Sequence, residues 1–408
     1  MEYGIAYLKN KLECKRSRIN LRYNYYDMKY HVEDMKGLLP ENFAWLSSTL
    51  GWCAKGVDTL ANRIVFHGFD NDDFYLSEIY QMNNLDVLAD NAVLSALISS
   101  CSFIYIGKDS AGYPTLQVID GGNATGIIDP ITNMLTEGYA VLERDKNDKP
   151  IREAYFRPYQ TAYYRNGVLE SNRILEHSAP YALLVPIINR PDAKRPFGHS
   201  RISRCCIDTV KAAVRTIRRS EVCAEFYSIP QKWVTGLSPD AEFNGQYATW
   251  SKFMALSNDE NGQKPSVGQF SAASMAPYID QLRMFASIFA GETDLTIEDL
   301  GFTSGNPASY EAIKASHENL KLTARKAQRT FGTGFLNAGY LAACIRDKQK
   351  YERMAFRNEK PYFAPIFEPD AQTIGAIGDA AFKINSASEG YLGARNLRDM
   401  TGMESDAV

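Results

Sequence analysis

The stretch Asn306-Pro-Ala-Ser-Tyr-Glu-Ala-Ile-Lys-Ala-Ser-His-Glu-Asn-Leu-Lys321 carries the strongest structural signal in this chain. Asn306 favours a helix start because its side-chain oxygen accepts hydrogen bonds from free N–H groups of the first turn, and Pro307 suits the first helical position. No glycine or further proline follows before Gly332, so we expect a long helix from 307 to about 331. If Gly332–Gly334 is tolerated, the helix continues to about 348.

The segment before this helix start, Leu300-Gly-Phe-Thr-Ser-Gly305, carries two glycines. We expect a flexible loop over 291–305, which is long for an ordered connection, so a functional role competes with that of an ordinary linker. A flexible loop that leads into a long capped helix is typical of a part that moves against something large.

Composition sets broad limits on the class of protein. The chain has 408 residues, enough for two or three domains of roughly 100–200 residues each. Apolar residues make up 45% of it, so we expect a large core. The formal net charge of −3 argues against a polybasic protein whose whole surface binds nucleic acid, although a local basic stripe remains compatible with it.

Cysteine and apolar patterns indicate a soluble protein without metal or cofactor. The seven cysteines include no Cys-x-x-Cys pair and the five histidines show no ligand spacing, so we expect buried free thiols in a reducing compartment. The N-terminus lacks a signal peptide pattern. The longest apolar runs, such as 92–98, are far shorter than the ~20 residues of a membrane span, so we expect no membrane association and no secretion.

Periodicity along the chain predicts an α+β fold. Seven short strand-like runs separated by Gly, Asp and Asn turns predict an antiparallel β region over 101–180, with hairpins at Lys146–Lys149 and Arg165–Gly167. Two helices that flank a small mixed unit at 231–270 are expected to lie antiparallel, with that unit at their far tip. The remaining expected elements are helices at 1–36, 45–62, 76–100, 200–228, 275–290 and 370–408, and strands at 64–69 and 352–367.

Catalytic signatures are absent from the sequence. Gly107-Lys108 lacks the upstream glycine of a phosphate-binding loop, and Gly332-Thr-Gly334 lacks the third glycine of a dinucleotide loop. Neither His-Glu-x-x-His nor Gly-x-Ser-x-Gly occurs. Asp70-Asn-Asp-Asp73 lacks the glycine and distal glutamate of a calcium loop, so we expect a solvated turn there. The sequence therefore predicts no catalytic, cofactor-binding or metal-binding residue.

The helix expected at 200–228 has a basic face. Helical spacing places four cations along one side, opposite an apolar side. A surface that meets a polyanion or a neighbouring subunit is one interpretation. A solvated face that pairs with Asp208 and Glu221 is the other. The four cations are Arg204, Lys211, Arg215 and Arg218.

Two motifs resemble the portal proteins of tailed bacteriophages, in particular those of siphoviruses with Gram-positive hosts. Arg195-Pro-Phe-Gly-His-Ser-Arg-Ile202 resembles the start of the portal stem, and Gly301–Ala315 is similar to the family's Asn-Pro-Ser-Ser-Ala-Glu-Ala-Ile stretch. Segment 42–69 resembles the family's wing core. Tyr23–Asp27 is similar to its Tyr-Tyr-x-Gly stretch but lacks the glycine.

The resemblance implies a domain order that agrees with the body, helix pair and tip expected from the residues. It assigns an N-terminal wing with the β region, a first stem helix, a clip, a second stem helix, a tunnel loop, a long wing helix, and a closing wing strand with a short crown. The corresponding ranges are 1–199, 200–229, 230–272, 273–291, 292–308, 309–350 and 351–408.

The resemblance also implies a function. Portals are non-enzymatic rings, usually of twelve subunits, at one capsid vertex of the virion. They conduct double-stranded DNA and dock the terminase large subunit and head–tail connector proteins, after assembly with capsid and scaffolding proteins in the host cytoplasm. By this resemblance the tunnel-loop residues would face the channel and a clip strand would dock partners. These residues are Thr303, Ser304, Gly305 and Asn306, and Lys232, Trp233 and Val234.

Two other classes stay open at this point. One is a capsid or head–tail adaptor protein that never conducts DNA. The other is an enzyme with a cryptic site, which a buried cluster of perturbed carboxylates in a cleft would support. A wide ring with a central hole would separate the portal interpretation from both.

Overall fold

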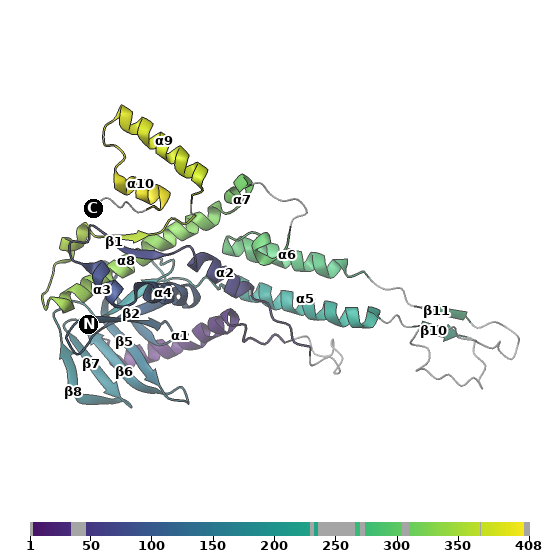
Figure 1. Cartoon of the computed structure of the whole chain (residues 1–408). Helices are drawn as coiled ribbons and strands as arrows, with labels where there is room; N and C mark the ends of the chain where they lie inside the picture. Colours follow the sequence, from purple (N-terminus) through teal and green to yellow (C-terminus); the bar gives the residue numbers. More distant parts are fainter. Residues whose placement is uncertain are drawn as a thin grey trace. The chain divides into compact units, whose positions relative to one another are not determined.

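The computed structural model has the expected α+β fold and describes residues 3–33, 46–228, 232–235, 266–269, 274–303, 310–367 and 369–403 (Figure 1). The chain divides into two compact units. We call the first the body; it comprises Met1–Tyr30, Gly51–Ile207 and Ala290–Val408. We call the second the helical unit; it comprises His31–Leu50 and Asp208–Phe289.

The body contains a five-stranded antiparallel sheet with the strand order β4-β5-β6-β7-β8. Asp148, Asn166 and Gly167 have positive φ at the β5–β6 and β7–β8 turns, which is why Asp, Asn and Gly mark these hairpins in the sequence. The strands are β4 (Ala124–Ile128), β5 (Leu135–Arg144), β6 (Pro150–Arg157), β7 (Gln160–Arg165) and β8 (Val168–Glu176).

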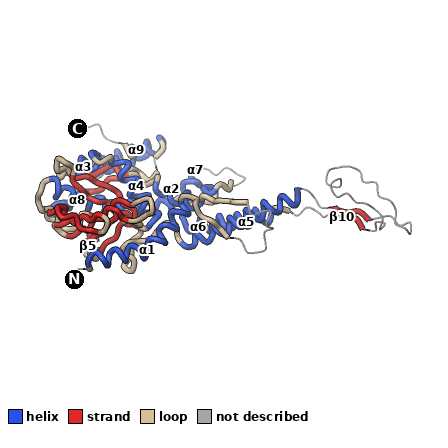
Figure 2. Tube along the Cα trace, turned by 90° about the horizontal axis from the view of Figure 1, so that it is seen from below, coloured by secondary structure: helices blue, strands red, loops and turns tan. Residues whose placement is uncertain are grey.

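A second sheet, of order β3-β2-β9, completes the β region. It consists of β2 (Cys101–Lys108), β3 (Pro114–Asp120) and β9 (Leu184–Ile188). Its Tyr105 ring lies 5.4 Å from that of Phe156 on β6, so the two sheets pack together. Figure 2 shows the strands of the body gathered in one block. The expected antiparallel β region is thus confirmed.

Helix α1 (Gly4–Tyr26) packs on the five-stranded sheet. Leu8 and Leu12 bury their side chains against three residues of β5 and β6. The Glu137 carboxylate on β5 accepts hydrogen bonds from the backbone N–H groups of Tyr3 and Gly4, at 2.8 and 3.0 Å, where the positive end of the helix dipole favours an anion. The three apolar partners on the sheet are Tyr139, Val141 and Tyr155.

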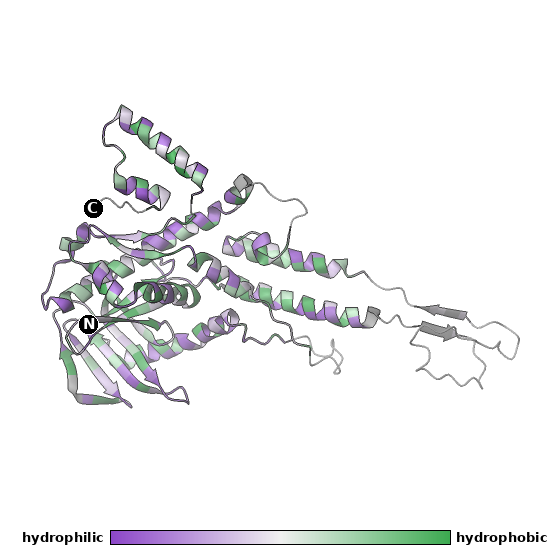
Figure 3. Ribbon diagram, in the orientation of Figure 1, coloured by the Kyte–Doolittle hydropathy of each residue, from purple (hydrophilic) through white to green (hydrophobic). Residues whose placement is uncertain are grey.

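Helix α8 (Glu318–Arg346) is the central helix of the body. Its Phe335 is fully buried and stacks at 4.6 Å on Phe66 of β1 (Phe66–Asp70), which pairs antiparallel with β12 (Lys360–Phe363). Helix α3 (Leu76–Met82) packs on α8, and α2 (Trp52–Ala61) packs on α4 (Leu85–Ser99). Figure 3 shows α4 as largely hydrophobic, and eight of its residues are buried.

Several expected boundaries were wrong. The helix predicted at 76–100 is two helices, because Asn84 has φ 56° and starts α4 anew. The long helix breaks at His317 into α7 (Tyr310–Ser316) and α8, although it does run through Gly332–Gly334. The strand predicted at 352–367 is only β12, after a 3-10 turn at Arg353–Arg357. The helix predicted at 45–62 begins only at Trp52.

The C-terminal helices α9 (Ala371–Ala387) and α10 (Ala394–Thr401) confirm the helices expected after 370. The solvated turn predicted at Asp70–Asp73 is confirmed for Asn71 and Asp73, which are exposed, but it is wrong for Asp70 and Asp72, which are half-buried. The Asp70 carboxylate is only 11% exposed and accepts from Arg395 at 2.9 Å and also from Arg398. Asp72 accepts from backbone N–H groups at the start of α3. These acidic side chains therefore hold helices in place.

The helical unit is built on α5 (Arg204–Ser228) and α6 (Ala276–Thr293). Thr216 Oγ1 lies 3.0 Å from the Gln281 side chain and Cys223 Sγ lies 3.0 Å from the Tyr278 hydroxyl, which confirms that the two helices pack antiparallel. Strands β10 (Lys232–Thr235) and β11 (Ser266–Gln269) pair antiparallel within the small unit predicted at 231–270. Residues 236–265 of the unit predicted at 231–270 lie outside the described residues.

Candidate functional site

The segment after α6 is the start of the expected tunnel loop. We call Thr293–Phe302 the strap. Its Thr296 and Asp299 cap the 3-10 turn Glu298–Leu300 reciprocally: Thr296 N donates to Asp299 Oδ2 at 2.9 Å and Asp299 N donates to Thr296 Oγ1 at 3.2 Å. Gly301 then takes φ 92°, a left-handed conformation that glycine adopts without steric cost. The strap is therefore an ordered turn with its own internal hydrogen bonds.

A buried arginine, Arg201, binds the first residue of the strap. Arg201 is 7% exposed, and its guanidinium donates to the carbonyl oxygen of Gly56 on α2 at 2.6 Å and to that of Thr293. Burial lowers the pKa of Arg201 to about 10, against the opposing effect of Asp294, whose carboxylate lies 3.9 Å away. One side chain thus ties the end of α6 to α2.

Two further contacts attach the strap to α8. Thr323 Oγ1 donates to Asp294 Oδ2 at 2.9 Å, and His317 Nε2 lies 3.2 Å from Asp299 Oδ2. Burial raises the pKa of Asp299, but hydrogen bonds from Thr296 and the nearby His317 outweigh it, so the pKa lies below its usual value. At the far end, the ring of Phe302 meets Trp52 edge-on, with centroids 6.5 Å apart. The strap is held along its whole length.

This anchoring changes the prediction for the loop. The sequence predicted a flexible loop over 291–305, yet α6 runs on to Thr293 and the strap is bonded to α2 and α8. Thr303 follows the strap and is exposed. Ser304, Gly305 and the expected cap Asn306 lie outside the described residues, as does Pro307, the expected first residue of the helix. The Thr-x-x-Asp capping pattern at 296–299 was readable in the sequence, but Arg201, His317 and Thr323 gave no signal of their role.

The basic face of α5 is narrower than helical spacing predicted. Arg204 is exposed, and Lys211 and Arg215 are half-buried. Arg218 is only 5% exposed, because it donates through Nη1 to the backbone oxygen of Val32 at 2.5 Å. Asp208, on the same helix, is exposed among them. Figure 3 shows hydrophobic and hydrophilic residues mixed along α5. The first three cations alone remain candidates for a surface role.

The expected clip residues Lys232, Trp233 and Val234 all lie on β10, opposite Gln269, Gly268 and Val267 of β11. The predicted strand is therefore present. Their role in docking a partner stays a prediction.

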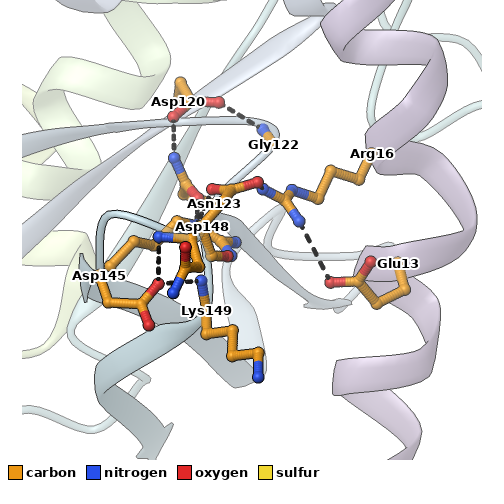
Figure 4. Close-up of polar contacts among 10 residues, drawn as sticks. Glu13, Arg16, Asp120, Gly122, Asn123, Asp145, Asp148 and Lys149 are labelled. Carbon is orange, nitrogen blue, oxygen red and sulfur yellow. Dashed lines mark hydrogen bonds and ion pairs between the residues drawn. The ribbon is translucent and has the colours of Figure 1, made fainter.

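A polar hollow of about 550 Å³ lies between α1 and the turns that follow β3 and β5 (Figure 4). Arg16 pairs with Asp148, and Arg144 Nε donates to Asn123 at 2.8 Å, while Arg144 Nη2 is buried without a hydrogen-bond partner. Asn123 in turn donates to Asp120 at 2.6 Å. The Arg16–Asp148 pair fastens α1 to the β5–β6 turn.

The described part of the chain offers no group of three or more His, Cys, Asp or Glu side chains placed to hold a metal ion. No described helix combines the length and apolarity that a membrane span requires. All seven cysteines are free, as expected, but only four are buried; Cys14 and Cys205 are exposed and Cys223 is partly so.

A family model described as "Phage portal protein, SPP1 Gp6-like" matches residues 5–353. The chain belongs to this portal family. The resemblance drawn from the motifs at 195–202 and 301–315 is thereby confirmed. The portal match ends ahead of β12, α9 and α10, so the C-terminal helices lie beyond the matched region.

Individual portal proteins are also similar to this chain. The portal protein of Mycobacterium phage L5 is 26% identical over 92% of this chain and 80% of its own length. That of Mycobacterium phage D29 is 26% identical over 94% of this chain and 82% of its own. Among solved structures, a chain in the neck of an empty gene transfer agent particle, computed with C6 symmetry, has a TM-score of 0.49 at 13% identity, covering 86% of this chain and 90% of that one.

Proposed function

We propose that this chain forms a ring, of twelve subunits, that conducts double-stranded DNA through one capsid vertex of the virion during packaging and ejection. Membership of the portal family carries this proposal. The ring assembles in the host cytoplasm with capsid and scaffolding proteins, and serves as a conduit without catalytic activity.

In this proposal the parts of the chain divide the work. Residues 1–199 are the wing, α5 and α6 the stem, 230–272 the clip, 292–308 the tunnel loop, 309–350 the long wing helix, and 351–408 the closing strand with a short crown. The clip strand β10 docks the terminase large subunit during packaging and the head–tail connector afterwards, by strand addition.

Contact with DNA is transient and independent of sequence, because a channel that binds its cargo tightly would stall translocation. Residues Thr303–Asn306 face the DNA in this proposal. The exposed and half-buried cations Arg204, Lys211 and Arg215 supply the weak, salt-dependent attraction to phosphates or pair with the neighbouring subunit.

Negative-stain microscopy of the purified full chain tests the ring. We expect rings with a central hole wide enough for duplex DNA; a monodisperse monomer at high concentration contradicts the proposal. Replacing 303–306 by four glycines tests the loop. Rings should still form while particles retain less packaged DNA. Full retention of packaged DNA would show that the loop does not act on DNA, and would favour a structural adaptor protein.

A further inference from the structure

The strap connects two parts of the body that the chain order separates. Arg201 precedes α5, and Thr323 and His317 belong to the start of α8, yet all three bind the same ten-residue segment. Resting on the proposed DNA-conducting role, we propose that Arg201, His317 and Thr323 are positioning residues that set the position of Thr303 in the tunnel loop.

The attachment at Arg201 is the most deeply buried of the three. A guanidinium at 7% exposure needs acceptors, since a buried charge without partners is costly. Here the acceptors are two backbone oxygens, those of Gly56 and Thr293, with the Asp294 carboxylate alongside. Backbone acceptors fix the path of the chain itself, so Arg201 determines the point at which α6 gives way to the strap.

The attachment at Thr323 acts on the residue that turns the chain. Asp294 has φ 53°, so the helix cannot continue through it. The Thr323 hydroxyl holds its carboxylate at 2.9 Å, one turn and a half inside α8. A neighbouring threonine on the same helix, Thr330, bonds only backbone oxygens within α8, at Lys326 and Ala327. Thr330 is therefore a matched control.

The attachment at His317 coincides with the break between α7 and α8. Its Nδ1 lies 2.9 Å from the Ile313 carbonyl oxygen and its Nε2 lies 3.2 Å from Asp299, with the side chain 14% exposed. Ser316 Oγ also lies 3.2 Å from Nδ1, so both ring nitrogens have polar partners. The His317 ring also contacts the Phe367 ring, and the Arg63 guanidinium lies 4.1 Å from the centre of the Phe367 ring.

These attachments have a common consequence. The contacts of Arg201, His317 and Thr323 all lie before Phe302, where the strap ends, so a displacement of α8 at His317 or Thr323 is transmitted along the strap to Thr303 of the tunnel loop. Twelve loops in a ring would then start at the same radius, which a conduit of fixed bore requires. The break at His317 thus places the imidazole in contact with Asp299 of the strap.

The test compares four variants of the full chain: Thr323→Val, His317→Ala, His317→Gln and the control Thr330→Val. Hydrogen exchange of 294–302 in the purified chain measures the anchoring, and packaged DNA retained by assembled particles measures the positioning. We expect about tenfold faster exchange in Thr323→Val and His317→Ala, with a several-fold loss of retained DNA. His317→Gln, which keeps a donor for Asp299, should recover part of both, and Thr330→Val should change neither.

Two results would overturn the proposal: unchanged exchange, which shows that these side chains do not anchor the strap, or faster exchange with full DNA retention, which shows an anchor without a positioning role. The failure of the underlying function is a separate result. If the glycine replacement of 303–306 leaves DNA retention intact, the loop does not act on DNA and the positioning role falls with it, whatever the exchange of the strap.

Discussion

The Nε atom of Arg201 donates a hydrogen bond of 2.6 Å to the carbonyl oxygen of Gly56, which joins the residue before α5 to the middle of α2. The same guanidinium bonds Thr293 at the end of α6. Three segments distant in the sequence therefore meet at one planar group. The planar fork of arginine suits this arrangement, whereas the single ammonium of lysine does not.

Replacement of Arg201 by Lys should therefore lower stability by about 2–4 kcal/mol, because a charge stays buried while at least one backbone oxygen loses its donor. The measurement is the urea midpoint of the purified chain. Arg204→Lys is the matched control, since Arg204 is the first residue of α5 and is exposed; its midpoint should stay within error. Equal effects of Arg201→Lys and Arg204→Lys on the urea midpoint would show that the buried contacts of Arg201 contribute nothing to stability.

Arg218 and Arg215 allow a second comparison within one helix. Helical spacing assigned them to the same basic face, but Arg218 is 5% exposed and bonds Val32, whereas Arg215 is half-buried. Arg218→Ala should destabilise the protein by about 1–3 kcal/mol, through the loss of a charge-assisted bond and of packing. Arg215→Ala should cost less than about 0.5 kcal/mol. If thermal unfolding showed that Arg215→Ala destabilises the protein more than Arg218→Ala, the burial of Arg218 would be contradicted.

The local chemistry of the sequence predicted those parts of the fold that short-range rules determine. Asn, Asp and Gly at 148, 166 and 167 adopt the positive φ that tight hairpins need, so the β region was readable. Apolar spacing likewise predicted α5, α6 and their antiparallel packing. The family motifs at 195–202 and 301–315 then connected these elements to a function.

The features that sequence reasoning predicted wrongly depend on contacts between residues far apart in the chain. Asp70–Asp73 looked like a solvated turn because its partners Arg395 and Arg398 lie at the other end of the chain. The break at His317 follows no glycine or proline; it coincides with the contact to Asp299. The strap looked flexible for the same reason, since its anchors lie before α5, at Arg201, and on α8, at His317 and Thr323. Helix propensity and loop length carry no information about such partners.

Glu359 should make stability depend on pH. It is 3% exposed, and burial, with Asp72 and Asp73 nearby, raises its pKa to about 7. An unfolded glutamate titrates near 4.3, so the folded state binds the proton more tightly between the two values. Stability therefore falls as pH rises from about 4.3 to 7 and stays lower above that range, by on the order of 2 kcal/mol.

Glu359→Gln removes this titration and keeps the size of the side chain. Its melting temperature should exceed that of the wild type at pH 8 and match it near pH 4.5. Glu352→Gln is the control, because Glu352 is exposed, and should give no gain at either pH. A wild-type difference between pH 4.5 and 8 that persists in Glu359→Gln would assign the pH dependence to other groups.

Gly334 tests why α8 contains three glycines. Alanine has the higher helix propensity by about 1 kcal/mol, so propensity alone predicts that Gly334→Ala stabilises the helix. A Cβ at this position would lie 2.5 Å from Ile187 Cδ1 and 3.2 Å from the Pro186 backbone oxygen of β9. Overpacking of this kind costs typically about 1–3 kcal/mol. Because the backbone of Pro186 cannot yield as a side chain does, we expect a net loss of stability.

The opposite outcome is expected at Gly378 on α9, where a Cβ would have no neighbouring atom within 4 Å. Gly378→Ala should therefore slow hydrogen exchange along α9, by up to about fivefold for a gain near 1 kcal/mol. The pair of variants separates packing from propensity: the same substitution lowers the unfolding midpoint at Gly334 and protects the helix at Gly378. Stabilisation at both positions would mean that β9 tolerates a closer approach than the structure indicates, and that the glycine is not needed for the packing of α8 on the sheet.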